Sequence, residues 1–240
     1  MAAIIIPARW QSSRFPGKPL ALIGGVPLIV RVWQRCLKAK CAKRVIVATD
    51  DMRIAETAFN AGAEVSMTKP NHPSGTDRVA EVAARLRTES LIINVQGDEP
   101  EIEPSLIDRL AACFVDSPRL AMATAASSIP DAVEFADPNV VKVVTDTTGN
   151  ALYFSRAPIP HDRDGGTHRT AMRHHGIYAY RRRFLLEFVK WKQTPLEKLE
   201  CLEQLRALEH GALIRVIRTK PAPPGIDTPE QAAAANKRLG

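Results

Sequence analysis

Three cations follow the first apolar run of the chain within a short stretch. Arg9, Arg14 and Lys18 lie just after Ile4 to Ile6, in a segment that begins at Pro7 and holds few acidic residues. Positive charges brought together in this way repel one another unless an anion neutralises them. Guanidinium groups bind phosphate oxygens in paired hydrogen bonds, and a lysine adds a mobile charge. The stretch therefore predicts a triphosphate site, with a solvated basic loop as the alternative.

Two carboxylates lie where a metal could be held. Asp98 follows the apolar run Leu91 to Val95, so the strand delivers it to the carboxyl edge of the sheet, where ligands of parallel sheets bind. Gly97 beside it lets the backbone approach a ligand. Such an acid suits Mg²⁺, which often takes one or two carboxylates plus substrate phosphates. A solvated turn is the alternative for Asp98.

Asp227 is the natural second acid. A helix cap would be its structural role, but Thr228 suits the N-cap better, with Pro229 at the first helical position and Gln231 three residues after the cap. This capping pattern leaves the carboxylate of Asp227 for another partner.

Apolar runs alternate with helical patterns through the first hundred residues. The order strand, helix, strand with short connections predicts a parallel, doubly wound α/β sheet. The predicted elements are strands at 3–6 (stopped by Pro7), 44–49, 64–67 and 91–95, and helices at 28–37, 52–61 and 76–86.

The second half of the chain has a different pattern. Residues 140–145 and 151–155 read as a hairpin, 156–173 as a Pro-, Gly- and charge-rich loop, and 174–180 and 213–217 as strands. An amphipathic helix is predicted at 196–208, with leucines 199, 202, 205 and 208 on its buried side, and a closing helix at 229–239. We expect one domain over residues 1–240, with an antiparallel insertion at about 140–195.

Composition narrows the class of protein. The net charge of +7 is spread over the chain rather than gathered in a recognisable nucleic-acid module. No apolar run approaches the roughly 20 residues that cross a bilayer, and no signal peptide is apparent. Four scattered cysteines suit reduced packing residues. We expect a cytoplasmic protein that binds neither nucleic acid nor membrane.

Several motifs together resemble one enzyme family. The pattern Pro-Ala-Arg-x-x-Ser-x-Arg-x-Pro-x-Lys-x-Leu, starting at Pro7, resembles the opening of sugar-acid cytidylyltransferases, and residues 94–100 (Asn-Val-Gln-Gly-Asp-Glu-Pro) resemble the 3-deoxy-manno-octulosonate (Kdo) branch. Further similar stretches, in order, are 74–78, 151–156, 174–178, 202–206 and 225–230. Glycine motifs of dehydrogenases and P-loop ATPases are absent from the sequence.

The resemblance implies a Rossmann-like nucleotidyltransferase fold and a Mg²⁺-dependent transfer of CMP from CTP to Kdo for lipopolysaccharide synthesis. It also implies a homodimer whose contact is made by the strands of the insertion.

It also implies roles for individual residues. Asp98 and Asp227 would hold the metal and, with Arg9 and Lys18, form the catalytic set. The nucleotide would contact Ala8, Arg9, Arg14, Lys18, Ser74, Gly75 and Gln96. The sugar would contact Arg78, Gln96, Arg156, Arg163, His174, Tyr178, Glu203 and Gln204. From the pattern alone, Glu203 and Gln204 read as a solvated helix face, and His174 and His175 face opposite ways on a strand, so they do not share one ion.

Two departures from the family and several alternatives bear on the substrate. His161 stands where the family commonly has Trp, and the loop 164–172 looks shorter than in many relatives. The nearest alternatives are cytidylyltransferases for 8-amino Kdo, a sialic acid or a polyol phosphate. A sugar-1-phosphate nucleotidyltransferase would show a Gly-x-Gly-x-Arg-Leu opening, which this sequence lacks. A nucleic-acid-binding module rests on charge alone, and an interaction scaffold would not explain acids placed opposite cations.

Overall fold

The isoleucine run at the start of the chain forms the central strand of a parallel sheet. The computed structural model describes residues 2–11, 14–164, 170–223 and 225–240. In it, β1 (Ala2–Ala8) pairs in parallel with β6 (Leu91–Asn94) on one side and with β4 (Ala42–Thr49) on the other. β5 (Glu64–Met67) continues the sheet beyond β4. Ile4, Ile5 and Ile6 are fully buried, as expected for a strand covered on both faces.

Contacts divide the chain into two compact units. The first comprises Met1–Ala111 and Ala222–Gly240, and the second comprises Ala112–Pro221. The mixed α/β fold with a mostly parallel sheet is confirmed, whereas the prediction of one domain with an insertion at about 140–195 stays a prediction. No helix among the described residues is long and apolar enough to span a membrane.

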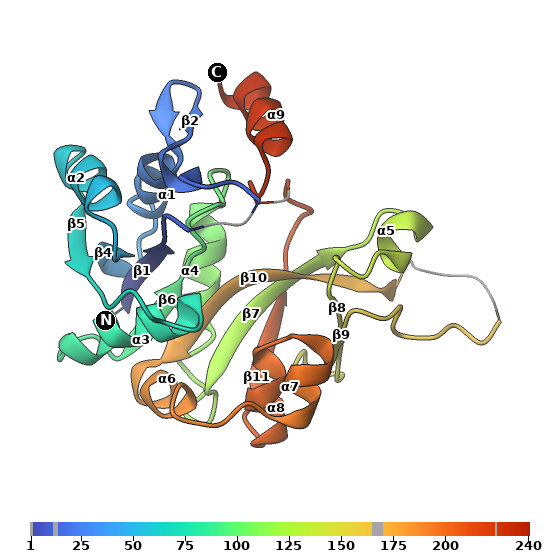
Figure 1. Cartoon of the computed structure of the whole chain (residues 1–240). Coiled ribbons are helices and arrows are strands. Elements are labelled where there is room, and N and C mark those ends of the chain that lie inside the picture. The colour runs from blue at the N-terminus through green and yellow to red at the C-terminus, as the bar shows by residue number, and fades with distance from the viewer. Residues whose placement is uncertain (1, 12–13, 165–169, 224) are drawn as a thin grey trace. The chain divides into compact units, whose positions relative to one another are not determined.

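Helices connect the parallel strands of the first unit (Figure 1). α1 (Leu28–Cys36) joins β1 to β4, α2 (Met52–Asn60) joins β4 to β5, and α3 (Gly75–Arg85) joins β5 to β6. The chain moves outward from β1 to β5 and then returns past β1 to β6. Right-handed crossovers therefore place α1 and α2 on one face and α3 on the other. The strand order reverses between β1 and β6, which is where ligands of such sheets bind. The unit also contains η1 (Lys18–Leu20), the hairpin of β2 (Leu22–Ile23) and β3 (Val26–Pro27), α4 (Pro104–Ala112) and α9 (Pro229–Leu239).

β1 continues through Pro7, so the prediction that it stops there is wrong. Pro7 pairs with Ala48 of β4, whereas the pairing with β6 ends at Ile5 and Asn94. Successive residues of a strand turn their backbone groups to opposite neighbours, and Pro7 turns toward the β6 side, beyond the last paired residue. The missing N–H of the proline therefore removes no ladder hydrogen bond.

The second unit is built around a strand of small residues, β7 (Met122–Ser128). β11 (Ile214–Arg218) pairs with it in parallel, and β10 (Met172–Arg181) pairs with it in antiparallel orientation. β8 (Lys142–Thr145) then pairs with β10 and with β9 (Ala151–Ser155), which confirms the predicted hairpin. The unit also contains α5 (Ala132–Ala136) and α6 (Arg182–Phe188).

The helix predicted at 196–208 is broken in two. α7 (Pro195–Glu200) ends at Cys201, which has a left-handed backbone conformation with φ 52°, and α8 (Gln204–Glu209) follows. The break turns Leu199 outward to 79% exposure while Leu202 and Leu205 stay buried. The prediction that Leu199 marks a buried face is therefore wrong, because one helical period does not continue across a left-handed residue.

Replacing Cys201 by glycine is expected to stabilise the protein. A left-handed conformation costs an L-residue roughly 1 kcal/mol that glycine avoids, and Cys201 is exposed, so little packing is lost. We expect Cys201→Gly to raise the free energy of unfolding by about 0.5–1 kcal/mol in urea denaturation. Cys201→Ala is the matched control, since it removes the thiol and keeps the strain. An equal gain in both variants would show that backbone strain is not the cause.

Candidate active site

A pocket of about 260 Å³ opens in the first unit at the carboxyl ends of β1 and β6. Every residue predicted to bind the nucleotide lines it, together with Arg78 and both predicted metal ligands. The full lining is Pro7, Ala8, Arg9, Gln11, Arg14, Lys18, Pro19, His72, Ser74, Gly75, Arg78, Gln96, Gly97, Asp98 and Asp227. The residues that the sequence placed after separate strands therefore share one cavity.

Lys18 lies between the two predicted metal ligands. Its Nζ donates to Asp98 Oδ2 at 2.8 Å and to Asp227 Oδ1 at 2.9 Å. Two oxygens bound to one nitrogen lie within about 6 Å of each other. The carboxylates thus converge although 129 positions, from 98 to 227, separate them in the sequence.

The backbone around both carboxylates is anchored. Ile226 N donates to the carbonyl oxygen of Asp98 at 2.9 Å, which ties the segment before α9 to the end of β6. Thr228 caps α9 and Gln231 completes the capping box, as predicted. Gln231 Oε1 also accepts from the backbone N of Asp227 at 2.6 Å. The Asp227 side chain is left to point at the cations.

The electrostatics of the basic loop differ from the expectation that only a bound anion could neutralise it. Arg14 Nη2 donates to Asp227 Oδ2 at 2.9 Å, and Lys18 contacts both acids. Acids of the same chain therefore neutralise part of the charge. Arg9, Arg14 and Lys18 still outnumber Asp98 and Asp227 in the pocket, so its balance favours an anion.

The two carboxylates fit the predicted Mg²⁺. They already converge on a cation, the ammonium of Lys18, and carboxylate oxygens are the hard ligands that Mg²⁺ takes. No group of three or more His, Cys, Asp or Glu side chains among the described residues forms a complete metal cage. Mg²⁺ usually relies on one or two carboxylates and on substrate phosphates for the rest, so two acids in a pocket with three cations fit this pattern.

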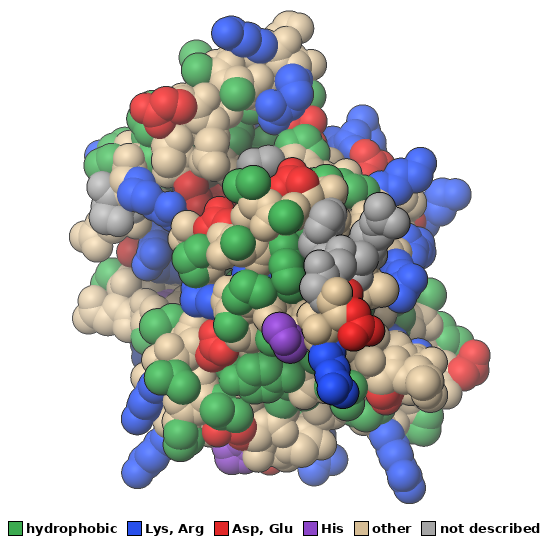
Figure 2. Space-filling model, turned by 90° about the vertical axis from the view of Figure 1, so that its right-hand side faces the viewer, with side chains coloured by type: hydrophobic (Ala, Val, Ile, Leu, Met, Phe, Trp, Pro, Cys, Tyr) green, Lys and Arg blue, Asp and Glu red, His purple; other side chains and the backbone are tan. Residues whose placement is uncertain are grey.

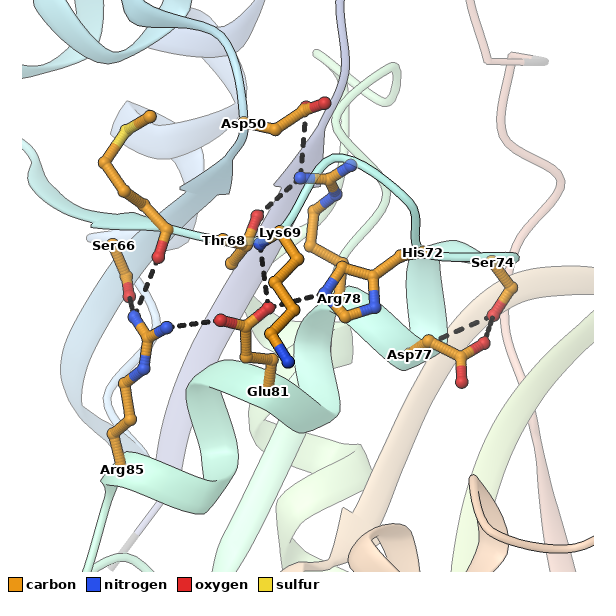
Figure 3. A network of polar contacts seen from close by, with 11 residues as sticks. Asp50, Ser66, Thr68, Lys69, His72, Ser74, Asp77, Arg78, Glu81 and Arg85 are labelled. Carbon is orange, nitrogen blue, oxygen red and sulfur yellow. Dashed lines mark hydrogen bonds and ion pairs between the residues drawn. The ribbon is translucent and has the colours of Figure 1, made fainter.

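The start of α3 forms another wall of the pocket (Figure 3). Ser74 is the N-cap, with its hydroxyl accepting from Asp77 N at 3.2 Å and donating to Asp77 Oδ2 at 2.7 Å. Arg78 is buried, contacts Thr68, and places Nη1 3.0 Å from Asp50 Oδ1. Arg78 was predicted to bind the sugar, and the structure puts it beside the predicted nucleotide residues, held by an acid of the chain.

His174 and Tyr178 come together in the second unit. Their ring centroids are 5.4 Å apart, and Phe154 lies 5.0 Å from His174. Four residues of regular strand would span roughly 13 Å, so this contact depends on the irregular register of β10 between His175 and Tyr178. Gly176, inside a strand pattern, is the sequence signal that could have revealed it.

Both histidines of β10 are neutral near pH 7. Burial lowers the pKa of His174 to about 3 and that of His175 to about 4. His174 Nε2 lies 2.9 Å from Thr124 Oγ1, and His175 Nε2 lies 2.9 Å from Ser127 Oγ. The two imidazoles therefore bond to different residues of β7.

The other predicted sugar residues of the second unit have mixed surroundings. Arg156 donates to two carbonyl oxygens, at 2.8 Å to Glu200 and at 3.0 Å to Pro138. Gln204 is 5% exposed, so the solvated face predicted from the pattern is wrong for it. Its Nε2 is buried with no hydrogen-bond partner in the described part of the chain. Glu203 is partly exposed and Arg163 is exposed. Residues 165–169 of the loop predicted at 156–173 lie outside the described residues.

Comparison with known proteins gives the family. A family model described as Cytidylyltransferase matches residues 3–215. The 3-deoxy-manno-octulosonate cytidylyltransferase of Syntrophotalea carbinolica is 51% identical over 243 residues, covering 98% of this chain and 97% of that protein. The protein of the same name from Vibrio cholerae is 50% identical over 240 residues, covering 95% and 93%. The chain belongs to the 3-deoxy-manno-octulosonate cytidylyltransferase family.

Solved structures agree with this family. A structure of CMP:2-keto-3-deoxy-manno-octonic acid synthetase complexed with CTP matches with a TM-score of 0.95 at 42% identity, covering 99% of this chain and 98% of that one. A 4-diphosphocytidyl-2C-methyl-D-erythritol synthase from Anaerococcus prevotii matches with a TM-score of 0.66 at 12% identity and shares the fold. The predicted family and fold class are confirmed.

Sequence reasoning missed His72 and the close approach of Gly97 to another part of the backbone. His72 lines the pocket, and its Nε2 contacts Glu81 of α3 (Figure 3); no motif pointed to it, because its partner lies on the next helix. Gly97 was predicted to let the backbone approach a ligand. Gly97 lines the pocket, so this stays a prediction. Gly97 also lies close to Pro7, since a Cβ on Gly97 would lie 2.8 Å from the Pro7 carbonyl oxygen.

Replacing Gly97 by alanine is expected to destabilise the first unit. The added methyl group would meet backbone rather than a flexible side chain, so β1 and the 96–98 turn must move apart. We expect Gly97→Ala to lower the free energy of unfolding by about 1–3 kcal/mol in urea denaturation. Gly75→Ala is the matched control, because its Cβ would lie 3.5 Å from Pro7 Cγ, an ordinary contact. Equal stability of the two variants would contradict the close approach.

Proposed function

We propose that this protein transfers CMP from CTP to the anomeric hydroxyl of 3-deoxy-manno-octulosonate, giving CMP-Kdo and pyrophosphate. The observation that carries the proposal is the pocket in which Lys18 bridges Asp98 and Asp227 beside Arg9 and Arg14. Membership of the 3-deoxy-manno-octulosonate cytidylyltransferase family supports the choice of substrates, as does the likeness to a synthetase complexed with CTP.

The residues of the pocket have separate roles in this reaction. Arg9, Arg14 and Lys18 bind the triphosphate and neutralise charge on the leaving pyrophosphate, which is the main work of catalysis in transfers of this kind. Ala8, Ser74, Gly75 and Gln96 surround the base and ribose. Asp98 and Asp227 would hold Mg²⁺, which would supply positive charge to the phosphate oxygens and lower the pKa of the attacking hydroxyl.

A nucleotide changes the partners of Lys18. Phosphate oxygens compete with the two carboxylates for its ammonium group, whose 2.8 Å and 2.9 Å contacts join it to the acids in the protein alone. With Lys18 bound to phosphate, Asp98 and Asp227 would be free to hold a divalent cation. The lysine therefore keeps the acids together before the substrate arrives.

The carboxylate of the sugar requires an arginine. His174 is held neutral by burial, so it donates or accepts a hydrogen bond but brings no charge. Tyr178, Gln204 and Gln96 can bond sugar hydroxyls without adding charge, and the Glu203 carboxylate can accept from them. The charge partner is thus one of Arg78, Arg156 and Arg163, in keeping with the preference of arginine for planar carboxylates.

We propose further that the enzyme needs Mg²⁺, forms a homodimer through the strands of the predicted insertion and works in the cytoplasm, where it activates Kdo for lipopolysaccharide synthesis. On the face shown in Figure 2, basic side chains lie among acidic and apolar ones. Because the net charge of +7 is spread along the sequence, we propose a small anionic substrate rather than a nucleic acid.

The experiment is pyrophosphate release from CTP, with and without Mg²⁺, over a panel of sugar acids. We expect release with Kdo and Mg²⁺, and its loss when EDTA removes the metal. Faster release with 8-amino Kdo or a sialic acid would assign the chain to that related substrate. Release with none of them would overturn the proposal.

A further inference from the structure

Trp10 closes the basic loop at its base. Its carbonyl oxygen accepts a hydrogen bond of 3.1 Å from Gly17 N, which joins the two ends of the segment that carries Arg14. Arg9 directly precedes this closure and Lys18 directly follows it. This backbone contact therefore brings the chain beside Arg9 close to the chain beside Lys18.

The indole ring of Trp10 contacts two further groups. The guanidinium carbon of Arg53 lies 3.3 Å from the ring centroid. Gly17, with φ 71°, packs against the ring so closely that a Cβ there would lie 2.9 Å from Trp10 Cη2. The ring thus joins the loop to an arginine of α2 and leaves no space for a side chain at position 17.

Arg53 is itself fixed. Its Nε and Nη2 donate to the two oxygens of Asp51 at 3.0 Å and 2.6 Å. Asp51 is the N-cap of α2, and its Oδ1 also accepts from Arg53 N at 3.0 Å. Because α2 follows β4, the neighbour of β1, these contacts connect the loop to the sheet. The charge of Arg53 is balanced by Asp51, so it adds little repulsion to the basic loop.

We propose that Trp10 and Arg53 are positioning residues for the polyphosphate. Neither lines the pocket, so they act through Arg9, Arg14 and Lys18, whose spacing they hold for adjacent phosphate groups. The inference rests on the proposed function only in taking the anion to be the triphosphate of a nucleotide. In this proposal the stacked pair of Trp10 and Arg53 influences the affinity for phosphate without contacting the phosphate itself.

Calorimetric titration with inorganic triphosphate tests this role without any turnover. We expect Trp10→Ala to weaken binding about tenfold and Arg53→Met about two- to fivefold, as a stacked cation and ring are lost. Trp10→Phe keeps a ring and is expected to stay within about twofold of the parent protein. Phe59→Ala is the control, because Phe59 lies on α2 like Arg53 and is 71% exposed. It is expected to bind triphosphate as tightly as the parent protein.

The kinetic counterpart is a rise in KM for CTP by the same factors, with KM for the sugar acid unchanged. A loss of affinity in Trp10→Phe equal to that in Trp10→Ala would overturn the role of the ring, as would unchanged triphosphate binding in Trp10→Ala. If Trp10→Ala does not fold, Arg53→Met decides, since its side chain is half exposed; parent-like triphosphate binding in that variant would overturn the proposal. Triphosphate binding without CMP transfer in the parent protein would refute the proposed function and leave this inference standing.

Discussion

Asp98→Asn is expected to lower the rate of pyrophosphate release by about 10²- to 10³-fold, because it removes a charge that holds the metal beside the transferred phosphoryl group. Asparagine keeps the size of the side chain and one oxygen, and Lys18 keeps its 2.9 Å contact with Asp227. The fold should therefore persist. Steady-state release with CTP, Kdo and Mg²⁺ measures the effect.

Asp116→Asn is the matched control for this variant, since it makes the same change at an exposed carboxylate of the second unit. It should turn over at the rate of the parent protein. Turnover of Asp98→Asn close to that of the control, with Mg²⁺ present, would remove Asp98 from the active site.

Lys18→Ala is expected to lower kcat/KM for CTP by roughly 10²-fold, because it deletes a charge-assisted contact to phosphate in a partly buried site. The side chain of Lys18 is 15% exposed, so water replaces the lost ammonium poorly. Most of the loss should appear in KM for CTP, with the KM for the sugar acid little changed.

The bridge formed by Lys18 adds a second expected result for the same variant. Without the ammonium, Asp98 and Asp227 repel each other in the free protein. We expect Lys18→Ala to bind Mg²⁺ more tightly than the parent protein when no nucleotide is present, as measured by calorimetry. An unchanged CTP dependence together with unchanged Mg²⁺ binding would contradict the role assigned to this lysine.

The pocket could be predicted from the sequence because the carboxyl ends of parallel strands lie at the same edge of a sheet. Arg9 and Asp98 follow buried apolar runs, and parallel strands deliver such residues to one edge of the sheet. Asp227 was found by a different route, since the capping pattern of Thr228 and Gln231 left its side chain without a structural role. Local rules were sufficient wherever the partner was a backbone group close in sequence.

Long-range pairing could not be predicted from local patterns. Lys18 meets acids 80 and 209 positions away, and nothing in the sequence around it specifies them. β7 is a strand although its small residues favour strands weakly, because β10 and β11 pair with its two edges. The break between α7 and α8 at Cys201 could not be predicted, because glycine is the usual residue with a left-handed backbone at a helix end and cysteine is not.

The most direct test of the proposed reaction follows the anomeric oxygen. Kdo labelled with ¹⁸O at the anomeric hydroxyl would be incubated briefly with the enzyme, CTP and Mg²⁺. The masses of the products would then be measured by mass spectrometry. Attack of that hydroxyl on the α-phosphate predicts CMP-Kdo that retains the label, with unlabelled pyrophosphate. Loss of the label from the sugar nucleotide, or the absence of a CMP-linked sugar, would contradict the account.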